Sequence, residues 1–235
     1  MAGLFSRRLD PRPPGGPVVV LLHGFGSDGQ RDWLDTGTAA MLAAFGHTVI
    51  VPDLPGHGSS PDPATAAEAH APAIARAVLD VLDGVERFDL VGYSLGARIA
   101  WELPALAGDR LGRCVLGGLA PGEPFAGVDV AALRRAVTYG EQPSDPFTAM
   151  IAGLARTPGR ALCVEGLRET PFTARSWSGK LPPVFVVGQD DGMTAGIEHI
   201  VELTPGAELV RVPGGHVEAL AGAGLREAVV KVLQG

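Results

Sequence analysis

The sequence contains only two cysteines, Cys114 and Cys163, and they do not form a Cys-x-x-Cys pair. Two such thiols supply neither a disulfide framework nor a four-thiolate metal site. This scarcity favours a reducing compartment, so we expect a cytoplasmic protein. The first sixteen residues carry arginines but no apolar segment after them, and they do not resemble a secretory signal.

Basic residues and long apolar runs are also scarce. The 19 lysines and arginines are outnumbered by 26 aspartates and glutamates, which gives a net charge of −7. Nucleic acid is not an expected partner, because its phosphate backbone is bound by basic surfaces. A membrane partner is not expected either, since no uncharged apolar run reaches the roughly 18–20 residues that span a bilayer. A hydrophobic content of 46% nevertheless predicts a folded chain, and 235 residues fit one large domain.

What the sequence does contain is a series of short, valine-rich runs separated by helix-like stretches. The runs predict strands, and their apolar character on both sides is typical of a parallel sheet covered on both faces. A regular strand–helix alternation predicts an α/β fold with a mostly parallel, doubly wound sheet. Strands are predicted at 17–22, 48–51, 88–91, 113–116, 184–187 and 208–212, and helices at 36–45, 65–82, 95–107, 196–203 and 217–233.

The alternation is interrupted over residues 120–180, where no strand-like run occurs. A structureless loop of that length is rare in a compact domain. We therefore predict a short helical cap at 120–180, inserted into a core formed by 1–119 and 181–235. Its helices are expected at 130–137, 147–155 and 160–167. The cap would cover the carboxyl edge of the sheet, where open α/β folds bind ligands; the alternative is a surface insertion without a role in the site.

The segment Gly92-Tyr93-Ser94-Leu95-Gly96 has the pattern G-x-S-x-G. It follows a predicted strand and precedes a predicted helix, which is the setting that an exposed nucleophilic serine requires. A tight turn with glycines and no chemistry is the alternative. The context favours Ser94 as a nucleophile.

A serine hydroxyl needs a base to take its proton and an acid to orient that base. His216 follows the last predicted strand through Pro-Gly-Gly, so it lies at the carboxyl edge of the sheet. Asp190 and Asp191 follow the preceding strand and reach the same edge, and either can be the orienting acid. The chain order Ser, Asp, His is the order of the α/β-hydrolases.

Five segments taken together resemble the successive signatures of the α/β-hydrolase family: HGFGS at 23–27, DLPGHGS at 53–59, GYSLGAR at 92–98, GQDD at 188–191 and GGH at 214–216. The resemblance implies the α/β-hydrolase fold, and an oxyanion hole formed by the amides of Phe25 and Leu95. It favours Asp191 over Asp190 as the acid. It also implies that neither a cofactor nor a metal is needed, and that Asp53 and His57 belong to a structural loop. A serine nucleophile separates the chain from the branches that attack with aspartate, such as epoxide hydrolases.

The implied activity is that of a serine hydrolase, similar to a carboxylesterase. Its substrate would be a small carboxylic ester or thioester, cleaved through an acyl-Ser94 intermediate. Tyr93, Arg98 and Phe147 are expected to contact this substrate, although Arg98 can instead pair with Glu102 one helical turn later, and Phe147 can pack inside the cap. The sequence predicts no oligomeric state.

Two other functions stay open at this stage. Several motifs, GYSLGAR above all, are also similar to those of 2-succinyl-6-hydroxy-2,4-cyclohexadiene-1-carboxylate synthases. These are lyases that use the same triad for proton abstraction and elimination. In such a site Arg98, together with Arg134, Arg135 or Arg175, would clamp a substrate carboxylate. The other function is a non-catalytic binding protein on the same fold.

Overall fold

A single twisted sheet organises the computed structural model, which describes residues 3–234. Within these residues seven strands pair in the order β1-β3-β2-β4-β5-β6-β7. All neighbours are parallel except β1 and β3, so the predicted mostly parallel α/β architecture is confirmed. The strands are β1 (Ser6–Leu9), β2 (Val18–Leu22), β3 (Thr48–Pro52), β4 (Phe88–Tyr93), β5 (Leu111–Gly117), β6 (Val184–Gly188) and β7 (Glu208–Val212).

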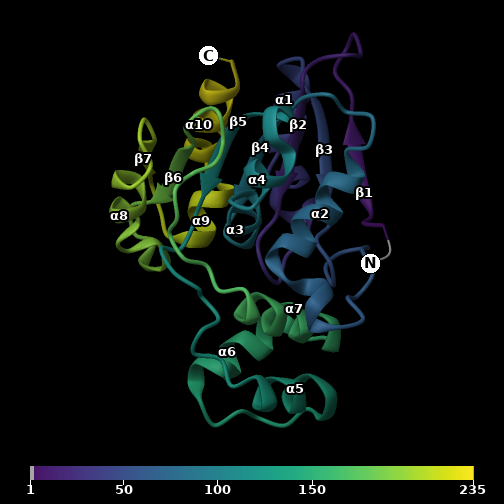
Figure 1. The fold of residues 1–235 in the computed structure, drawn as a ribbon, viewed down its shortest axis with the longest axis vertical. Coiled ribbons are helices and arrows are strands. Elements are labelled where there is room, and N and C mark those ends of the chain that lie inside the picture. The colour runs from purple at the N-terminus through teal and green to yellow at the C-terminus, as the bar shows by residue number, and fades with distance from the viewer. Residues whose placement is uncertain (1–2, 235) are drawn as a thin grey trace.

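Helices cover both faces of the sheet, as Figure 1 shows. Successive residues of β2 belong to different cores: Val19 and Leu21 face one, and Val20 and Leu22 face the other. The first core is closed by α1 (Thr38–Ala44), α9 (His216–Ala221), α10 (Ala223–Gln234) and the short π-helical turn η1 (Gln30–Leu34). The second is closed by α2 (Ala71–Val81), α3 (Leu95–Ala100), α4 (Leu103–Ala107) and α8 (Ile197–Glu202).

Three predicted helices are each split in two. Pro72 and Pro104 stand in the first turn of α2 and α4, because proline lacks the N–H that a continuous helix would need there. The chain before α2 forms only the 3₁₀ turn η2 (Ala66–Ala69). Gly222, whose backbone is extended, separates α9 from α10. Two further short turns are η3 (Gly108–Arg110) and η4 (Gly192–Thr194).

The sequence did not predict strand β1. It pairs antiparallel with β3, and the guanidinium of Arg7 lies 2.8 Å from the Asp53 carboxylate at the end of β3. Two of its four residues are arginines, and the strand is only partly buried at the sheet edge, so it lacks the apolar pattern that predicted the other strands. Within the described residues β1 is the one antiparallel strand at this edge.

Three helices connect β5 to β6 and lie across the carboxyl end of the sheet (Figure 1). They are α5 (Val130–Tyr139), α6 (Pro146–Ala155) and α7 (Pro158–Glu169), within two residues of the predicted cap helices at both ends. Each begins at a side chain that accepts a backbone N–H: Asp129, Asp145 or Thr157. Among the described residues no helix is long and apolar enough to cross a membrane.

Candidate active site

Ser94 occupies the sharp turn between β4 and α3. Its backbone has φ +52° and ψ −112°, a conformation that L-residues rarely adopt and that turns at functional sites impose. Neighbouring glycines make the turn possible: a Cβ on Gly92 would lie 2.4 Å from the Gly96 carbonyl oxygen, and one on Gly96 would lie 2.0 Å from that of Leu22. The G-x-S-x-G spacing therefore reflects close packing of α3 against β2 and β4.

His216 is the first residue of α9, separated from β7 by Pro-Gly-Gly, and its Nδ1 lies 2.7 Å from Asp191 Oδ2. The other oxygen of Asp191 accepts the backbone N–H of Met193 at 3.0 Å, and the side chain is almost fully buried. Asp190 is exposed, and its carboxylate makes no hydrogen bond within residues 3–234. Of the two candidate acids, Asp191 contacts His216.

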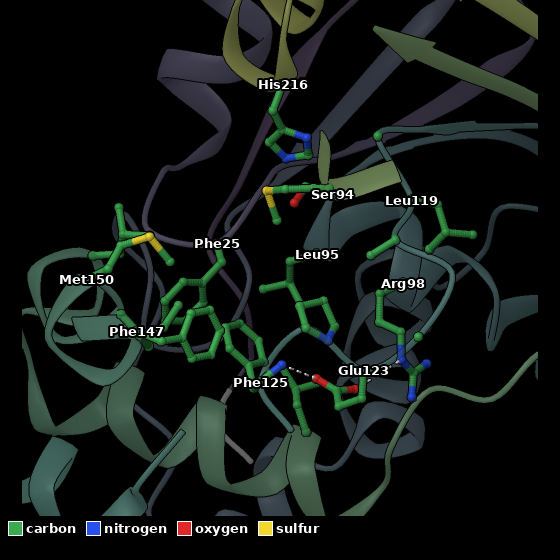
Figure 2. A pocket seen from close by; sticks show the side chains of 18 of the residues that line it. Phe25, Ser94, Leu95, Arg98, Leu119, Glu123, Phe125, Phe147, Met150 and His216 are labelled. Carbon is green, nitrogen blue, oxygen red and sulfur yellow. Dashed lines mark hydrogen bonds and ion pairs between the residues drawn. The ribbon is translucent and has the colours of Figure 1, made fainter. Parts of the chain in front are cut away.

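Ser94 and His216 line the same cavity of about 330 Å³ (Figure 2). His216 points at Ser94 from the loop after β7, and the cap supplies the opposite wall. Most lining groups are apolar, so the cavity suits a hydrocarbon group. The apolar lining includes Phe25, Leu95, Leu119, Phe125, Phe147, Met150, Ile151, Leu154, Leu167, Met193 and Val217.

The amides of Phe25 and Leu95 lie beside the serine on two different elements. Phe25 follows β2 through His23 and Gly24, and Leu95 opens α3. In the described part of the chain neither N–H donates to a protein acceptor. A Cβ on Gly24 would lie 3.5 Å from Ser94 Cβ, so this loop abuts Ser94. Both residues line the cavity.

Tyr93 does not line the cavity, which corrects the expectation that it contacts substrate. Its side chain is buried on the opposite side of the strand from Ser94, in the core that α9 and α10 cover. The Tyr93 hydroxyl donates to the carbonyl oxygen of His216 at 2.6 Å. This bond anchors the backbone that carries the imidazole.

Arg98 lies at the end of the cavity away from His216 (Figure 2), and its guanidinium is held by protein groups. Nη1 donates to Glu102 at 2.6 Å and Nη2 to the Thr170 carbonyl at 2.8 Å. Nε lies 3.9 Å from Glu123 and has no hydrogen-bond partner within the described residues. The pairing with Glu102 is the alternative that the i,i+4 spacing allowed.

The other arginines considered for a carboxylate clamp are paired with glutamates outside the cavity lining. Arg134 pairs with Glu165, Arg135 with Glu141, and Arg175 with Glu102.

Glu123 lines the same end of the cavity, and the sequence did not identify it. Its carboxylate accepts the N–H groups of Phe125 and Phe172, each at 3.1 Å. Burial raises the pKa of the Glu123 carboxyl, while these bonds and the nearby Arg98 oppose the shift. The available signal was its place in the loop after β5, at the carboxyl edge of the sheet.

Three apolar residues of α6 differ in exposure. Phe147 is 37% exposed, Met150 is 53% exposed and Ile151 is buried, yet all three line the cavity. Phe147 thus faces the cavity rather than the interior of the cap.

Asp53 and His57 lie away from the cavity lining, and His57 Nδ1 lies 2.8 Å from the Pro55 carbonyl oxygen while its Nε2 has no hydrogen-bond partner in the described residues. Asp53 accepts from Arg7 and from the N–H groups of Gly29 and Ser59. Burial, together with neighbouring His23, lowers the pKa of His57 to about 3, so its ring is neutral. In residues 3–234 no group of three or more potential ligand side chains is arranged to hold a metal ion.

Known proteins of similar sequence carry several activities. The chain is 36% identical over 99 residues to epoxide hydrolase 3 of Siraitia grosvenorii, covering 41% of this chain and 30% of that protein. It is 43% identical over 89 residues to the 2-succinyl-6-hydroxy-2,4-cyclohexadiene-1-carboxylate synthase of Enterobacter sp., covering 37% and 31%. The chain thus spans only about a third of the length of these curated relatives.

Solved structures match over nearly the whole chain. A thermophilic esterase from Thermogutta terrifontis superposes with a TM-score of 0.77 at 21% identity, covering 98% of this chain and 93% of that one. The enol-lactonase from Burkholderia xenovorans gives 0.71 at 19% identity, covering 99% and 96%. At these identities the likeness establishes the fold.

The model of the alpha/beta hydrolase family matches residues 19–228, which run from β2 into α10 and include every element around Ser94. Because that match spans the sheet, the cap and the loops that carry Asp191 and His216, the chain belongs to the alpha/beta hydrolase family.

Proposed function

We propose that this protein is a serine hydrolase that cleaves a carboxylic ester or thioester with an uncharged, largely apolar acyl group. The observation that carries the proposal is the Asp191–His216 pair facing Ser94, which stands on a strained turn at the wall of an apolar cavity. This is the arrangement of nucleophile, base and orienting acid that acyl transfer requires.

In the acylation step the Ser94 hydroxyl oxygen bonds to the substrate carbonyl carbon while His216 Nε2 takes the hydroxyl proton. Asp191 holds Nδ1–H, which keeps the basic lone pair on Nε2 and stabilises the imidazolium. The negative charge moves onto the carbonyl oxygen, where the free N–H groups of Phe25 and Leu95 bind it. The intermediate then collapses, the bond to the alcohol or thiol breaks, and the leaving group receives the proton from His216.

Deacylation repeats these steps with water as the nucleophile. His216 takes a proton from water, the resulting oxygen attacks the acyl carbon, and the same two amides bind the oxyanion. Ser94 leaves as the alcohol when the imidazolium returns the proton, and a carboxylic acid is released. Each proton is returned within one cycle, so the reaction needs no co-reactant other than water.

The charges at the inner end of the cavity favour an uncharged acyl group. Arg98 and Arg175 are matched by Glu102 and Glu123, two positive groups against two negative ones. A substrate carboxylate placed there would add an unpaired buried charge, which costs several kcal/mol. A methyl-terminated chain adds none and buries against the aromatic and aliphatic lining.

A lyase of the menaquinone-pathway type is the second candidate, and the 43% identity to the Enterobacter sp. synthase over 89 residues favours it. Such an enzyme would use Ser94 and His216 for proton abstraction and elimination. The charge pairing of Arg98 argues against it, because a substrate carboxylate would have to compete with Glu102 and Glu123 for that guanidinium.

The test combines active-site labelling with a matched pair of esters. A fluorophosphonate probe followed by intact-mass and peptide analysis should modify Ser94, and should fail to modify Ser94→Ala. Turnover is then compared between p-nitrophenyl hexanoate and the mono-p-nitrophenyl ester of adipic acid, which differ by the terminal carboxylate. We expect the adipate ester to have a kcat/KM at least about tenfold lower.

Each possible outcome decides between the candidates. Labelling of Ser94 without turnover of any ester, but with pyruvate release from the menaquinone precursor, supports the lyase. Absence of both labelling and turnover overturns the proposal. Faster turnover of the adipate ester would leave the hydrolase in place and overturn the uncharged acyl group.

A further inference from the structure

A buried carboxylate, Asp32, lies behind the loop that carries Phe25. It belongs to η1, its residue is 5% exposed, and it does not line the cavity. Asp32 Oδ2 accepts the N–H of Gly24 at 2.8 Å, and Oδ1 accepts the hydroxyl of Ser27 at 2.5 Å. One carboxylate thus binds both sides of Phe25 in the chain.

Within residues 3–234 no cation forms an ion pair with Asp32, so its charge is offset mainly by these two hydrogen bonds. Burial raises the pKa of the Asp32 carboxyl, and the bonds from Ser27 and Gly24 and the nearby His23 oppose the shift. Burying a carboxylate without a paired cation costs free energy of folding. The two hydrogen bonds that offset this cost also maintain the conformation of the loop.

The peptide unit between Gly24 and Phe25 is held through its carbonyl oxygen, and the N–H that Asp32 binds belongs to the preceding peptide. The Gly24 carbonyl oxygen lies 2.8 Å from His23 Nδ1, and His23 Nε2 accepts the N–H of Leu54 at 2.9 Å. Because a trans peptide is planar, its N–H points away from its C=O. Fixing the Gly24 carbonyl therefore also fixes the direction of the Phe25 N–H.

Gly24 lies between Asp32 and the nucleophile. A Cβ placed on it would be 3.5 Å from Asp32 Oδ2 and 3.5 Å from Ser94 Cβ. Loss of the Asp32 bond would free the Gly24 backbone at the point where the loop meets Ser94. A shift of about 1 Å in a catalytic group costs on the order of 10²-fold in rate.

We infer that Asp32 is a positioning residue for the oxyanion hole: by binding the Gly24 N–H and the Ser27 hydroxyl it holds the loop on both sides of the Gly24–Phe25 peptide, so that the Phe25 N–H faces the oxygen of the reacting carbonyl. The inference rests on the proposed acyl-transfer function. Asp32 touches neither substrate nor Ser94 Oγ, and it acts through the loop.

Two substitutions separate positioning from charge. In Asp32→Asn the amide oxygen can still accept from Gly24, while the amide nitrogen donates to Ser27 Oγ, because a hydroxyl reverses its role. Both bonds survive and the charge is lost. In Asp32→Leu a side chain of similar size makes neither bond.

We expect Asp32→Leu to lower kcat by about 10–100-fold with little change in KM, because one oxyanion donor is misdirected rather than removed. Asp32→Asn should stay within about threefold of wild type. A hexyl trifluoromethyl ketone, whose adduct with Ser94 bears an oxyanion, should bind Asp32→Leu more weakly by about the same factor as kcat falls.

The matched control is Asp89→Leu. Asp89 accepts the N–H of Arg113 at 2.6 Å. It lies near the amino end of β4, whereas Ser94 follows the carboxyl end of the same strand. This variant should lose stability but keep kcat and the ketone affinity. If Asp32→Leu is not recovered folded, Asp32→Ala is measured at reduced temperature by the same criteria.

Two results would overturn the inference. One is an Asp32→Leu enzyme that melts earlier yet keeps wild-type kcat and ketone affinity; the other is an equal loss of kcat in Asp32→Asn and Asp32→Leu. Failure of the proposed function is distinct from both, because it appears in the wild-type protein as absence of fluorophosphonate labelling and ester turnover.

Discussion

Replacing Asp191 with asparagine tests the direction of proton transfer at the site. Asp191 Oδ1 accepts the Met193 N–H, and Oδ2 faces His216 Nδ1. A backbone N–H can only donate, so the asparagine oxygen must stay with Met193 and its NH₂ group must face the histidine. His216 Nδ1 then has to accept, which moves the ring proton to Nε2, where it cannot take a proton from Ser94.

The expected loss is large because the base is converted into the wrong tautomer rather than displaced. We expect kcat to fall by about 10⁴-fold, equivalent to about 5 kcal/mol of transition-state stabilisation. The thermal midpoint should change little, since volume and both hydrogen bonds are retained. Steady-state kinetics on p-nitrophenyl hexanoate, with fluorophosphonate labelling rates as a second readout, measure the effect.

Asp190→Asn is the matched control, because it removes the neighbouring carboxylate from the same loop. Asp190 is exposed and makes no contact with His216, so its loss should leave kcat within about threefold of wild type. If instead Asp190→Asn were the inactive variant and Asp191→Asn retained more than about a tenth of kcat, the tautomer argument would be refuted.

Three further predictions concern the nucleophile, the cavity and acid stability. Ser94→Ala should lower kcat by about 10³–10⁶-fold with an unchanged fold, and retention of more than about a tenth of the activity would rule out an acyl-Ser94 intermediate. Phe147→Ala should shift the ester preference to longer or bulkier acyl groups, since a methylene in an apolar pocket contributes about 1–3 kcal/mol; an unchanged kcat/KM series with a lower melting temperature would place Phe147 in packing alone. Between about pH 6 and 4 the unfolded chain protonates His57, whereas the folded protein, in which the pKa of His57 is about 3, does not. The free energy of unfolding should therefore fall by about 1.4 kcal/mol for each unit by which the pH is lowered in this range, as the contribution of this residue. Denaturant titrations of His57→Phe should show that much less pH dependence, and exposed His199→Asn should keep the wild-type slope.

The sequence alone was sufficient for the features that arise from local patterns. Valine-rich runs predicted six of the strands to within about two residues, because a strand buried on both faces must be apolar throughout. The three cap helices followed from apolar periodicity between proline-containing breaks. The G-x-S-x-G turn was recognisable from its place between a predicted strand and a predicted helix, although the contact that excludes a side chain on Gly96 is with Leu22, which is distant in the chain.

The sequence did not predict β1 or the helix breaks, because neither is marked by a change in the apolar pattern. Strand β1 has two arginines in four residues and pairs only at the sheet edge, so its stability comes from β3 and not from its own apolar content. The three split helices were predicted as continuous because the apolar periodicity continues across the break. Pro72, Pro104 and Gly222 mark the positions where the helices are interrupted.

Tertiary structure decided which of several suitable side chains reach the site. Asp190 and Asp191 follow the same strand, and only the course of the loop aims the second at His216. Tyr93 precedes Ser94, so strand alternation sends it into the opposite core, where it binds the His216 backbone.

The same holds for groups whose partners are distant in the chain. The partners of Arg98 include Thr170, 72 residues later, which no local pattern could reveal. Asp32 gave no signal at all, since a single carboxylate in a polar loop is normally solvated. Spacing and periodicity thus predicted the elements and the turn that carries Ser94, whereas hydrogen bonds formed only after folding pair Asp191 with His216, engage Arg98 and place Asp32 behind the loop that carries Phe25.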